Sequence, residues 1–308
     1  MPPSRSPRRF WLRLPGLLLA GIFLWLGLSA GVVYTLTHRL SPPSGEPLPL
    51  DAHGWLEEVR LTTRDGLDIG GWFAPGKNHR ALVLLLHGNG GRRSDWLGFA
   101  HQLHQQGIGV MGITFRGHGD SAGGFNDLGY GGRWDVLAAL DYIKQHNPKR
   151  PIVVVGFSLG AAAALFAGEE ARLAGWDYAV QGYVLESPYP DIGTALDHRL
   201  EIYLPAGLDQ LAGWGIRGVA PWMLPHWPKI APVNSIRQLP PEIPILFLEG
   251  ELDQRVTRED ITRLIKPVSE QARRVPFKRA RHGEARRKNP QRYLKSVLEL
   301  IQRAEKNH

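Results

Sequence analysis

The sequence Gly-Phe-Ser-Leu-Gly at residues 156–160 constrains the fold of this chain more than any other segment. It follows an apolar run at 152–155 and leads directly into an alanine-rich run at 161–166. This order predicts a strand, a sharp turn and a helix. Glycines are needed on both sides of Ser158 because a bend this tight leaves no room for flanking Cβ atoms. The turn would lift the Ser158 hydroxyl clear of the sheet, next to the positively polarised N-terminus of the helix.

Apolar runs suited to strands alternate with helical patterns along most of the chain. We expect strands at residues 57–63, 67–73, 82–86, 109–114, 152–155, 180–185 and 243–248. We expect helices near residues 96–105, 133–145, 159–170 and 258–265. This alternation predicts an α/β fold, with a mostly parallel sheet that carries helices on both faces and begins with an antiparallel hairpin. Active sites in such sheets lie beyond the carboxyl ends of the strands.

Composition sets wider bounds on the chain. Its 308 residues, 43% of them hydrophobic, can bury the core of a single α/β domain, which we expect at residues 55–308. The sequence contains no cysteine, which excludes disulfides, a cysteine nucleophile and a cysteine-ligated metal.

Four further segments carry a family resemblance. Residues 82–86 are followed by His-Gly-Asn-Gly-Gly at 87–91, and residues 115–121 read Phe-Arg-Gly-His-Gly-Asp-Ser. An apolar run at 245–248 leads to Asp253, and His282 lies just before a predicted C-terminal helix. With the turn at Ser158, these segments resemble the α/β-hydrolase superfamily, in its serine-aminopeptidase-like and membrane-anchored lipase or thioesterase branch. The resemblance covers about residues 55–305 and implies an α/β-hydrolase fold with a short lid after the sixth strand.

The order of the candidate catalytic residues fits this resemblance. A serine hydroxyl becomes an effective nucleophile when a base removes its proton and an acid orients that base. The family order is serine, acid, histidine, which Ser158, Asp253 and His282 satisfy. The backbone N–H groups of Leu159 and Asn89 would form the oxyanion hole. This chemistry needs no metal and no organic cofactor.

Other residues compete for the acid and base roles. The competing acids are Glu251, Asp191 and Asp209. The competing histidines are His87, His118, His198 and His226. We expect His87 to shape the oxyanion loop and His118 to belong to a glycine-rich turn. Asp253 and His282 are preferred because each follows a predicted strand in the family order, the strand at 243–248 for Asp253 and a strand-like run at 275–278 for His282.

The N-terminus predicts a membrane anchor. Residues 14–36 are almost uncharged and long enough to span a bilayer. Arginines at positions 5, 8, 9 and 13 precede this run, so the positive-inside rule leaves residues 1–13 in the cytoplasm and the catalytic domain on the extracytoplasmic side. The alternative is a cleaved signal peptide with a small-residue region at 29–31. We expect a single-pass protein in which the proline-rich linker 37–54 holds the domain off the membrane.

The segment from about 197 to 237 interrupts the alternation and predicts the lid. It contains Trp214, Trp222 and Trp227, which we assign to substrate binding, and several prolines and glycines. An aromatic lid on a membrane-tethered enzyme suggests a lipid or another acyl-containing substrate. The alternative is that these tryptophans only pack the lid onto the sheet.

These features predict a membrane-anchored serine hydrolase that cleaves a carboxylic ester or thioester through an acyl-enzyme. The alternatives are an aminopeptidase-like amide hydrolase and a non-catalytic binding module tethered to the membrane. An ester is preferred to an amide because the lid is short and poor in carboxylates. The net charge is +8, and the basic run at 273–295 would either attract anionic headgroups or form a solvated helix face. Nucleic acid is not an expected partner, because no recognition module is present.

Overall fold

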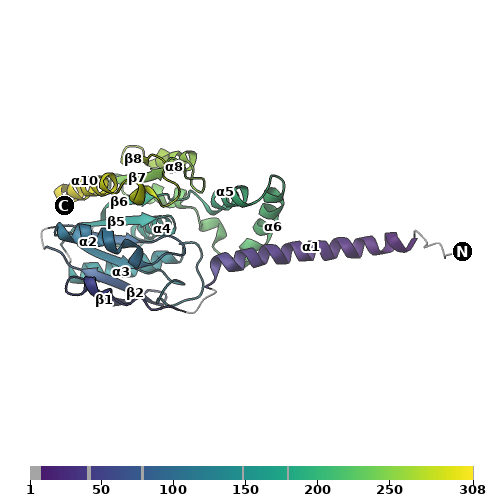
Figure 1. Ribbon diagram of the computed structural model, residues 1–308, viewed down its shortest axis with the longest axis horizontal. Helices are drawn as coiled ribbons and strands as arrows, with labels where there is room; N and C mark the ends of the chain where they lie inside the picture. Colours follow the sequence, from purple (N-terminus) through teal and green to yellow (C-terminus); the bar gives the residue numbers. More distant parts are fainter. Residues whose placement is uncertain (1–7, 40–42, 78–79, 148, 179, 308) are drawn as a thin grey trace.

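The computed structural model describes residues 8–39, 43–77, 80–147, 149–178 and 180–307. An eight-stranded sheet forms its centre, with the strand order β1-β2-β4-β3-β5-β6-β7-β8 (Figure 1). Strand β2 pairs antiparallel with β1 and β4, and all other neighbours are parallel. The strands are β1 (Glu57–Thr62), β2 (Asp68–Ala74), β3 (Leu82–Leu86), β4 (Gly109–Ile113), β5 (Ile152–Phe157), β6 (Val180–Glu186), β7 (Ile245–Gly250) and β8 (Ala272–Phe277).

Helices cover both faces of this sheet. The α-helices are α1 (Arg8–Thr37), α2 (Leu97–Gln105), α3 (Gly132–His146), α4 (Leu159–Leu173), α5 (Ile192–Tyr203), α6 (Leu208–Met223), α7 (Pro232–Ser235), α8 (Arg258–Ile265), α9 (Ala285–Lys288) and α10 (Pro290–Asn307). Side chains alternate along β3, so Leu84 belongs to the apolar cluster that includes residues of α3, α4 and α8, whereas Val83 belongs to the cluster that includes residues of α2 and α10. The predicted α/β-hydrolase fold, with a mostly parallel sheet between two helical layers, is confirmed.

Element boundaries differ from the sequence-based expectation mainly at the end of the sheet. Strand β8 begins at Ala272, although apolar character is evident only from Val275 onward. This strand lies at the edge of the sheet, and its first three residues are exposed or only partly buried. The polar beginning of the strand therefore gave no hydrophobic signal.

The lid begins earlier than expected. Helix α5 begins at Ile192 and not near residue 197, because Asp191 caps it. The Asp191 carboxylate accepts a hydrogen bond from the backbone N–H of Thr194 at 2.8 Å. Helices α5, α6 and α7 follow one another before β7, so the lid occupies the expected place after β6.

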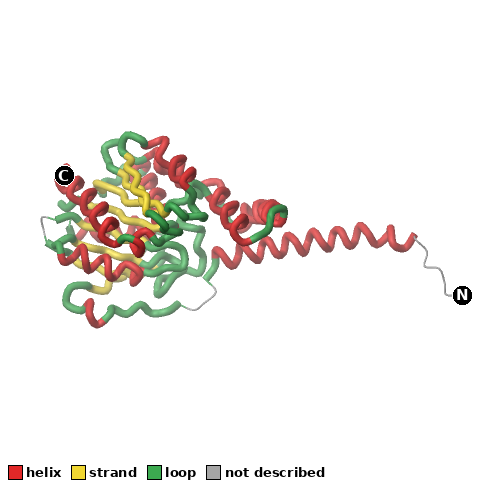
Figure 2. The backbone as a smooth tube through the Cα atoms, turned by 45° about the horizontal axis from the view of Figure 1, so that its top comes forward, coloured by secondary structure: helices red, strands yellow, loops and turns green. Residues whose placement is uncertain are grey.

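Helix α1 projects from the globular domain toward the N-terminus (Figures 1 and 2). Its segment Pro15–Thr37 is long and apolar enough to cross a membrane, by length and composition. This segment coincides within one residue with the predicted anchor at 14–36. Of the expected cytoplasmic residues 1–13, residues 1–7, including Arg5, lie outside the described part of the chain.

The chain after α1 packs against the domain, which corrects the expected role of the linker. Ser44 N–H donates to the backbone oxygen of Gly119 at 3.0 Å. The Glu46 side chain is buried in an ion pair with Arg93, 3.1 Å from its guanidinium. A carboxylate is buried favourably only when it is paired in this way, and the sequence of the linker does not reveal its partner. The described part of the linker is therefore bound to the domain and is not a free, extended spacer.

Candidate active site

Ser158 lies on a strained turn between β5 and α4. Its φ and ψ angles are 50° and −109°, a backbone conformation that is costly for a non-glycine residue. The flanking glycines are required, as expected. A Cβ on Gly156 would lie 2.6 Å from the nitrogen of Ala161, and one on Gly160 would lie 2.5 Å from the oxygen of Leu86. The turn is thus locked between its own helix and the neighbouring strand β3.

Three side chains far apart in sequence form one hydrogen-bonded series. The Oγ atom of Ser158 lies 3.0 Å from Nε2 of His282, and Nδ1 of His282 lies 2.9 Å from Oδ2 of Asp253. Ser158 follows β5, Asp253 follows β7 and His282 follows β8. These strands are parallel, so their carboxyl ends bring the three loops to the same edge of the sheet.

Asp253 is held as a carboxylate in a buried position. Its Oδ1 atom accepts hydrogen bonds from the backbone N–H groups of Arg255 at 2.9 Å and Val256 at 3.0 Å. Burial opposes ionisation, but the hydrogen bond and charge of His282 and the Val256 N–H outweigh it, so the pKa of Asp253 lies below its usual value. An ionised Asp253 accepts from Nδ1–H of His282, which leaves Nε2 of the neutral ring as the acceptor facing Ser158.

The rival acids have other partners or lie in solvent. Asp191 caps α5 and forms an ion pair with Arg263 at 2.7 Å. Asp209 accepts the backbone N–H of Gly207 at the start of α6. Glu251 is exposed. None of the three is hydrogen-bonded to His282 in the described part of the chain.

The rival histidines near the site support loops. His87 is fully buried, and its Nε2 atom accepts the backbone N–H of Phe115 at 2.9 Å. Burial lowers the pKa of His87 to about 3, so the ring is neutral and its Nδ1–H donates to the backbone oxygen of Gly88. His118 Nε2 accepts the backbone N–H of Gly90 at 3.0 Å. Both rings therefore hold the 87–91 loop, a role that the sequence predicted for His87 but not for His118.

The other two histidines lie in the lid. His198 is paired with Asp260 at 3.2 Å, and the His226 ring packs against that of Tyr130. Neither forms a hydrogen bond to Ser158 among the described residues.

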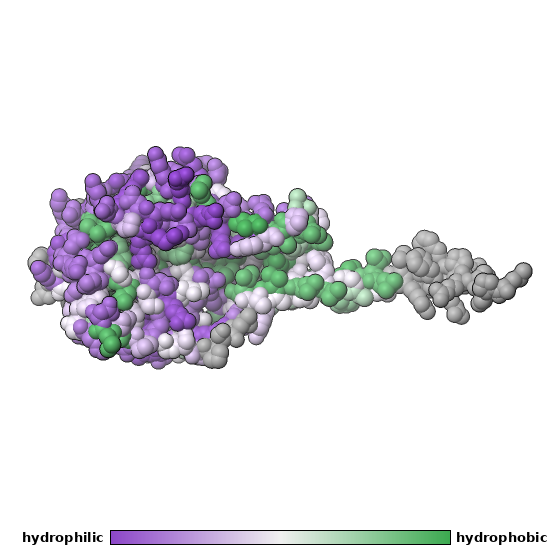
Figure 3. Space-filling model, in the orientation of Figure 1, coloured by the Kyte–Doolittle hydropathy of each residue, from purple (hydrophilic) through white to green (hydrophobic). Residues whose placement is uncertain are grey.

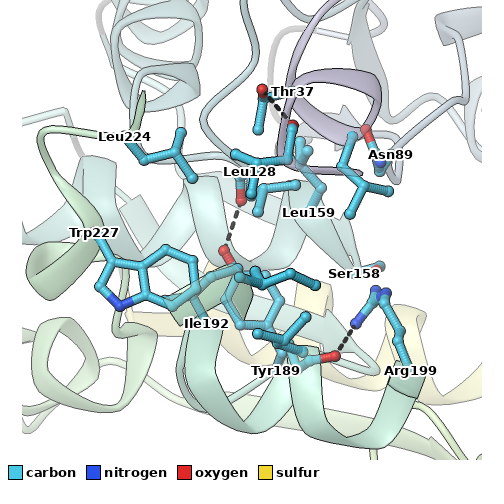
Figure 4. Close-up of a pocket in the computed structure, with 15 residues that line it drawn as sticks. Thr37, Asn89, Leu128, Ser158, Leu159, Tyr189, Ile192, Arg199, Leu224 and Trp227 are labelled. Atoms are coloured by element: carbon cyan, nitrogen blue, oxygen red, sulfur yellow. Dashed lines mark hydrogen bonds between the residues drawn. The ribbon is translucent and has the colours of Figure 1, made fainter. Parts of the chain in front are cut away.

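The two predicted oxyanion donors lie beside Ser158. Asn89 and Leu159 both line the pocket that contains the Ser158 side chain (Figure 4). Leu159 is the first residue of α4, a position whose N–H group has no acceptor within the helix. The Asn89 side-chain oxygen accepts from the Asn126 amide at 2.8 Å, which fixes the loop that carries the Asn89 backbone.

The pocket at Ser158 is mostly apolar and is formed by three parts of the chain (Figure 4). Its residues come from α1, from the loops around Ser158 and from the lid: Val33, Leu36, Thr37, Asn89, Leu128, Ser158, Leu159, Tyr189, Ile192, Ala195, Leu196, Arg199, Ile216, Leu224 and Trp227. Trp227 therefore lies at the pocket. Trp214 and Trp222 do not, because they are 66% and 89% exposed on the outside of α6.

Sequence reasoning missed several residues of this pocket. Val33 and Leu36 belong to the predicted anchor and Thr37 begins the predicted linker. Nothing in their sequence indicates that they lie beside a serine more than 100 positions away. Arg199 lies in the segment assigned to the lid, but no motif marks it. Tyr189 could have been found, because it closely follows the carboxyl end of β6, where such sites lie.

Comparisons with known proteins identify the family to which this chain belongs. The family model described as "Serine aminopeptidase, S33" matches residues 77–238, just over half of the chain. An uncharacterised protein of Mycobacterium tuberculosis is 28% identical over 250 residues, covering 79% of this chain and 78% of its own. The lysophosphatidylserine lipase ABHD12 of Gallus gallus is 33% identical over 129 residues, covering 39% of this chain and 32% of its own.

Solved structures show the same fold. The Pyrococcus furiosus esterase PF2001 aligns with a TM-score of 0.66 at 23% identity, covering 86% of this chain and 98% of its own. The esterase EaEST of Exiguobacterium antarcticum aligns with a TM-score of 0.59 at 16% identity, covering 80% of this chain and all of its own. Fold, motif order and family match agree, and the chain belongs to the serine aminopeptidase S33 family of α/β hydrolases.

Proposed function

We propose that this protein is a membrane-anchored serine hydrolase that cleaves a carboxylic ester or thioester of an acyl substrate. The observation that carries the proposal is the hydrogen-bonded series Ser158–His282–Asp253, with separations of 3.0 and 2.9 Å, at the wall of an apolar pocket. The names of an esterase and a lipase among its relatives support the same reaction class.

The reaction would proceed in two halves. Ser158 Oγ attacks the acyl carbonyl while His282 Nε2 takes its proton, and Asp253 stabilises the resulting imidazolium. The backbone N–H groups of Leu159 and Asn89 donate to the oxyanion of the tetrahedral intermediate. His282 then protonates the leaving alcohol or thiol, which leaves an acyl-enzyme on Ser158. A water molecule, deprotonated by His282, releases the acid in the second half.

The character of the pocket favours an acyl substrate over a peptide. An aminopeptidase needs an anionic group to hold the substrate's terminal ammonium. No carboxylate is among the described residues that line the pocket, and its charged member is Arg199. A cationic amine would be repelled there, whereas an alkyl chain would be favoured by burial among Leu and Ile side chains.

The membrane anchor is proposed to be uncleaved, with the domain on the extracytoplasmic side. Arginines 8, 9 and 13 precede the apolar segment Pro15–Thr37. Cleavage near residues 29–31 would remove Trp25 and Ser29, which pack against Gly215 of the lid. Cleavage would thus remove side chains that contact the lid, and these contacts support an uncleaved helix.

Hydrolysis of p-nitrophenyl esters by the full-length protein in detergent tests the proposed function. We expect Ser158→Ala and His282→Ala each to reduce kcat by roughly 10⁴-fold or more, because the two side chains act as a unit. The exposed Ser269→Ala is the matched control and should retain wild-type turnover. Wild-type protein without activity on any ester or thioester, or turnover that survives Ser158→Ala, would favour a binding module instead.

A further inference from the structure

The end of helix α1 forms part of the wall of the pocket at Ser158. Val33, Leu36 and Thr37, in its last two turns, line this pocket. Val33 is only 4% exposed and packs in one cluster with Ile216 and Leu224 of the lid region. The element that resembles a simple anchor thus also shapes the space next to the candidate nucleophile.

The position of this helix end is fixed by the domain. The backbone oxygen of Thr37 accepts the N–H of Asn126 at 2.7 Å, and the N–H of Arg39 donates to Gly124 at 2.7 Å. The Arg39 guanidinium also donates to the backbone oxygen of Ser121 at 2.9 Å. These bonds tie the last turn of α1 to the loop beyond β4, so the pocket wall is part of the folded domain.

Helix α6 of the lid runs alongside α1 (Figure 1). The Trp25 indole N–H donates to the backbone oxygen of Leu211 at 3.2 Å. A Cβ on Gly215 would collide with the side chains of Ser29 and Trp25, so glycine is what permits this close approach. Both helices contribute side chains to the pocket wall, Val33 and Leu36 from α1 and Ile216 from α6.

The outer side of α6 exposes large apolar side chains. Leu208, Leu211, Trp214 and Trp222, which we call the lid face, are 54%, 45%, 66% and 89% exposed. Their spacing places them on one side of the helix. Helix α1 also exposes leucines, and the space-filling view shows apolar surface on α1 and on the neighbouring lid (Figure 3). Exposed apolar patches of this kind mark contact surfaces, and tryptophan suits the membrane interface.

We propose that the lid face lies in the lipid bilayer beside α1, and that the acyl chain of the substrate enters the Ser158 pocket sideways from the bilayer, between α1 and α6. The bilayer is the occupant that the surface fits, because the lid face continues the surface of a helix able to cross a membrane. The charged Arg217 of α6 is compensated by an ion pair with Asp197 of α5. The entry of an acyl chain rests on the proposed function, whereas the membrane contact of α6 does not.

Fluorescent labelling tests the membrane contact without reference to activity. The chain has no cysteine, so Trp214→Cys and Trp222→Cys each create a single labelling site for an environment-sensitive dye. In phosphatidylcholine vesicles that carry nitroxides on the lipid acyl chains, we expect blue-shifted emission and strong quenching at both positions. A dye at the exposed Gln302→Cys on α10 is the control and should behave as in water. Labels at 214 and 222 that match the control, or that shift to the blue without quenching by the lipid, as in contact with a second protein copy, would refute the membrane contact.

Substitution in α1 tests the entry path. Leu36 is 44% exposed at the pocket, so Leu36→Trp would narrow the pocket with little effect on the core. We expect the ratio of kcat/KM for a long-chain ester to that for an acetyl ester to fall roughly tenfold. Leu28→Trp makes the same exchange two turns earlier, outside the pocket, and should keep the wild-type ratio. An unchanged ratio in Leu36→Trp refutes the entry path. Absence of hydrolysis in the wild type would instead contradict the proposed function, and the dye experiment would still decide the membrane contact.

A second, independent inference concerns Arg199 of α5. This side chain lines the pocket with Ser158 and points toward it (Figure 4). Its guanidinium donates to the backbone oxygen of Ala195 at 2.8 Å, and no carboxylate pairs with it among the described residues. Burial and the neighbouring charge of Arg255 lower the pKa of Arg199, and the charge of Asp253 partly opposes this effect. Arg199 is only partly exposed and forms no ion pair with the described residues, so its guanidinium has donors left for an anionic ligand in the pocket.

We infer that Arg199 binds an anionic group of the substrate, while the acyl chain fills the apolar part of the pocket. A guanidinium suits this role because it can hold phosphate or carboxylate oxygens through two hydrogen bonds. The test compares a monoacylglycerol phosphate with the matching monoacylglycerol. We expect Arg199→Gln to lower the ratio of kcat/KM for the phosphate to that for the neutral ester by roughly tenfold, with partial rescue by Arg199→Lys. The exposed Arg258→Gln on α8 should keep the wild-type ratio. An unchanged ratio in Arg199→Gln would refute the assignment.

Discussion

The residues with the proposed chemistry are those that the sequence predicted best. Ser158 has glycines two positions away on either side, and Asp253 and His282 each follow a strand in the family order. Their positions in the sequence predict the site because the loops that follow parallel strands all lie at the same edge of the sheet. Arg199 had no such signal. Arg199 lines the pocket without an ion pair to any described residue, and a sequence does not show such spatial relations.

A single buried residue, Glu186, predicts how the free energy of unfolding depends on pH. It ends β6, its backbone oxygen accepts the N–H of Ser158 at 2.9 Å, and burial raises its pKa to about 7. The unfolded chain loses this proton near pH 4.5, whereas the folded protein keeps it until about pH 7. The free energy of unfolding therefore falls as pH rises through this window and levels off above it.

Replacement of Glu186 by Gln removes this titration while preserving the size of the side chain. We expect Glu186→Gln to be stabilised relative to wild type by about 3 kcal/mol more at pH 8 than at pH 4.5, since each pKa unit corresponds to about 1.4 kcal/mol. Urea unfolding of both proteins in detergent at the two pH values measures the difference. An equal effect of the substitution at both pH values would show that Glu186 does not titrate in this way.

At the scale of elements, the sequence predicted those helices and strands whose bounds follow from the local hydrophobic pattern. It did not predict features that depend on contacts with distant parts of the chain. The buried strand β3 and helix α8 begin and end where their sequences indicate. The polar start of β8 gave no signal because it is an edge strand. The largest omission was α1, whose apolar residues predict a membrane span but do not reveal that Val33 also packs against the lid. Contacts of this kind depend on tertiary partners, which periodicity does not encode.

The junction of β5 and α4 provides a prediction for an element. A methyl group at Gly160 would press against the backbone oxygens of Leu86 and His87, neither of which can move without displacing β3. We expect Gly160→Ala to lower the free energy of unfolding by about 1–3 kcal/mol and to reduce ester turnover. Gly98→Ala on α2 is the matched control, because its methyl group would meet no atom within 4 Å. Stability equal to wild type in Gly160→Ala would show that the turn is not tightly packed.

The whole molecule combines a hydrolase domain with a helix that is both its proposed anchor and a pocket wall. Helix α6 packs against α1, and α5 packs against α6, so the domain, the lid and the membrane segment form one unit (Figure 2). Part of the basic run at 273–295 is structural, since Arg273 pairs with Glu299 and Arg274 with Glu249. Its charge is therefore partly compensated, which leaves the apolar surface at α1 and α6 as the stronger candidate for membrane contact.

The orientation of this unit can be tested on intact cells. The arginines before the apolar segment Pro15–Thr37 predict that residues beyond it lie outside the cytoplasm. A reporter enzyme that is active only after export, fused after His308, should therefore be active. A reporter that is active only in the cytoplasm, fused at the same place, should be silent. The opposite pattern would reverse the assigned topology.

Covalent labelling tests the central claim, that Ser158 is a nucleophile activated by His282, most directly. Full-length protein treated with a fluorophosphonate should gain the mass of one adduct, and peptide mapping should locate it on Ser158. Ser158→Ala should gain no adduct, and His282→Ala should react far more slowly. An adduct on another residue, or a wild-type protein that stays unmodified while a known serine hydrolase in the same tube reacts, would contradict the account.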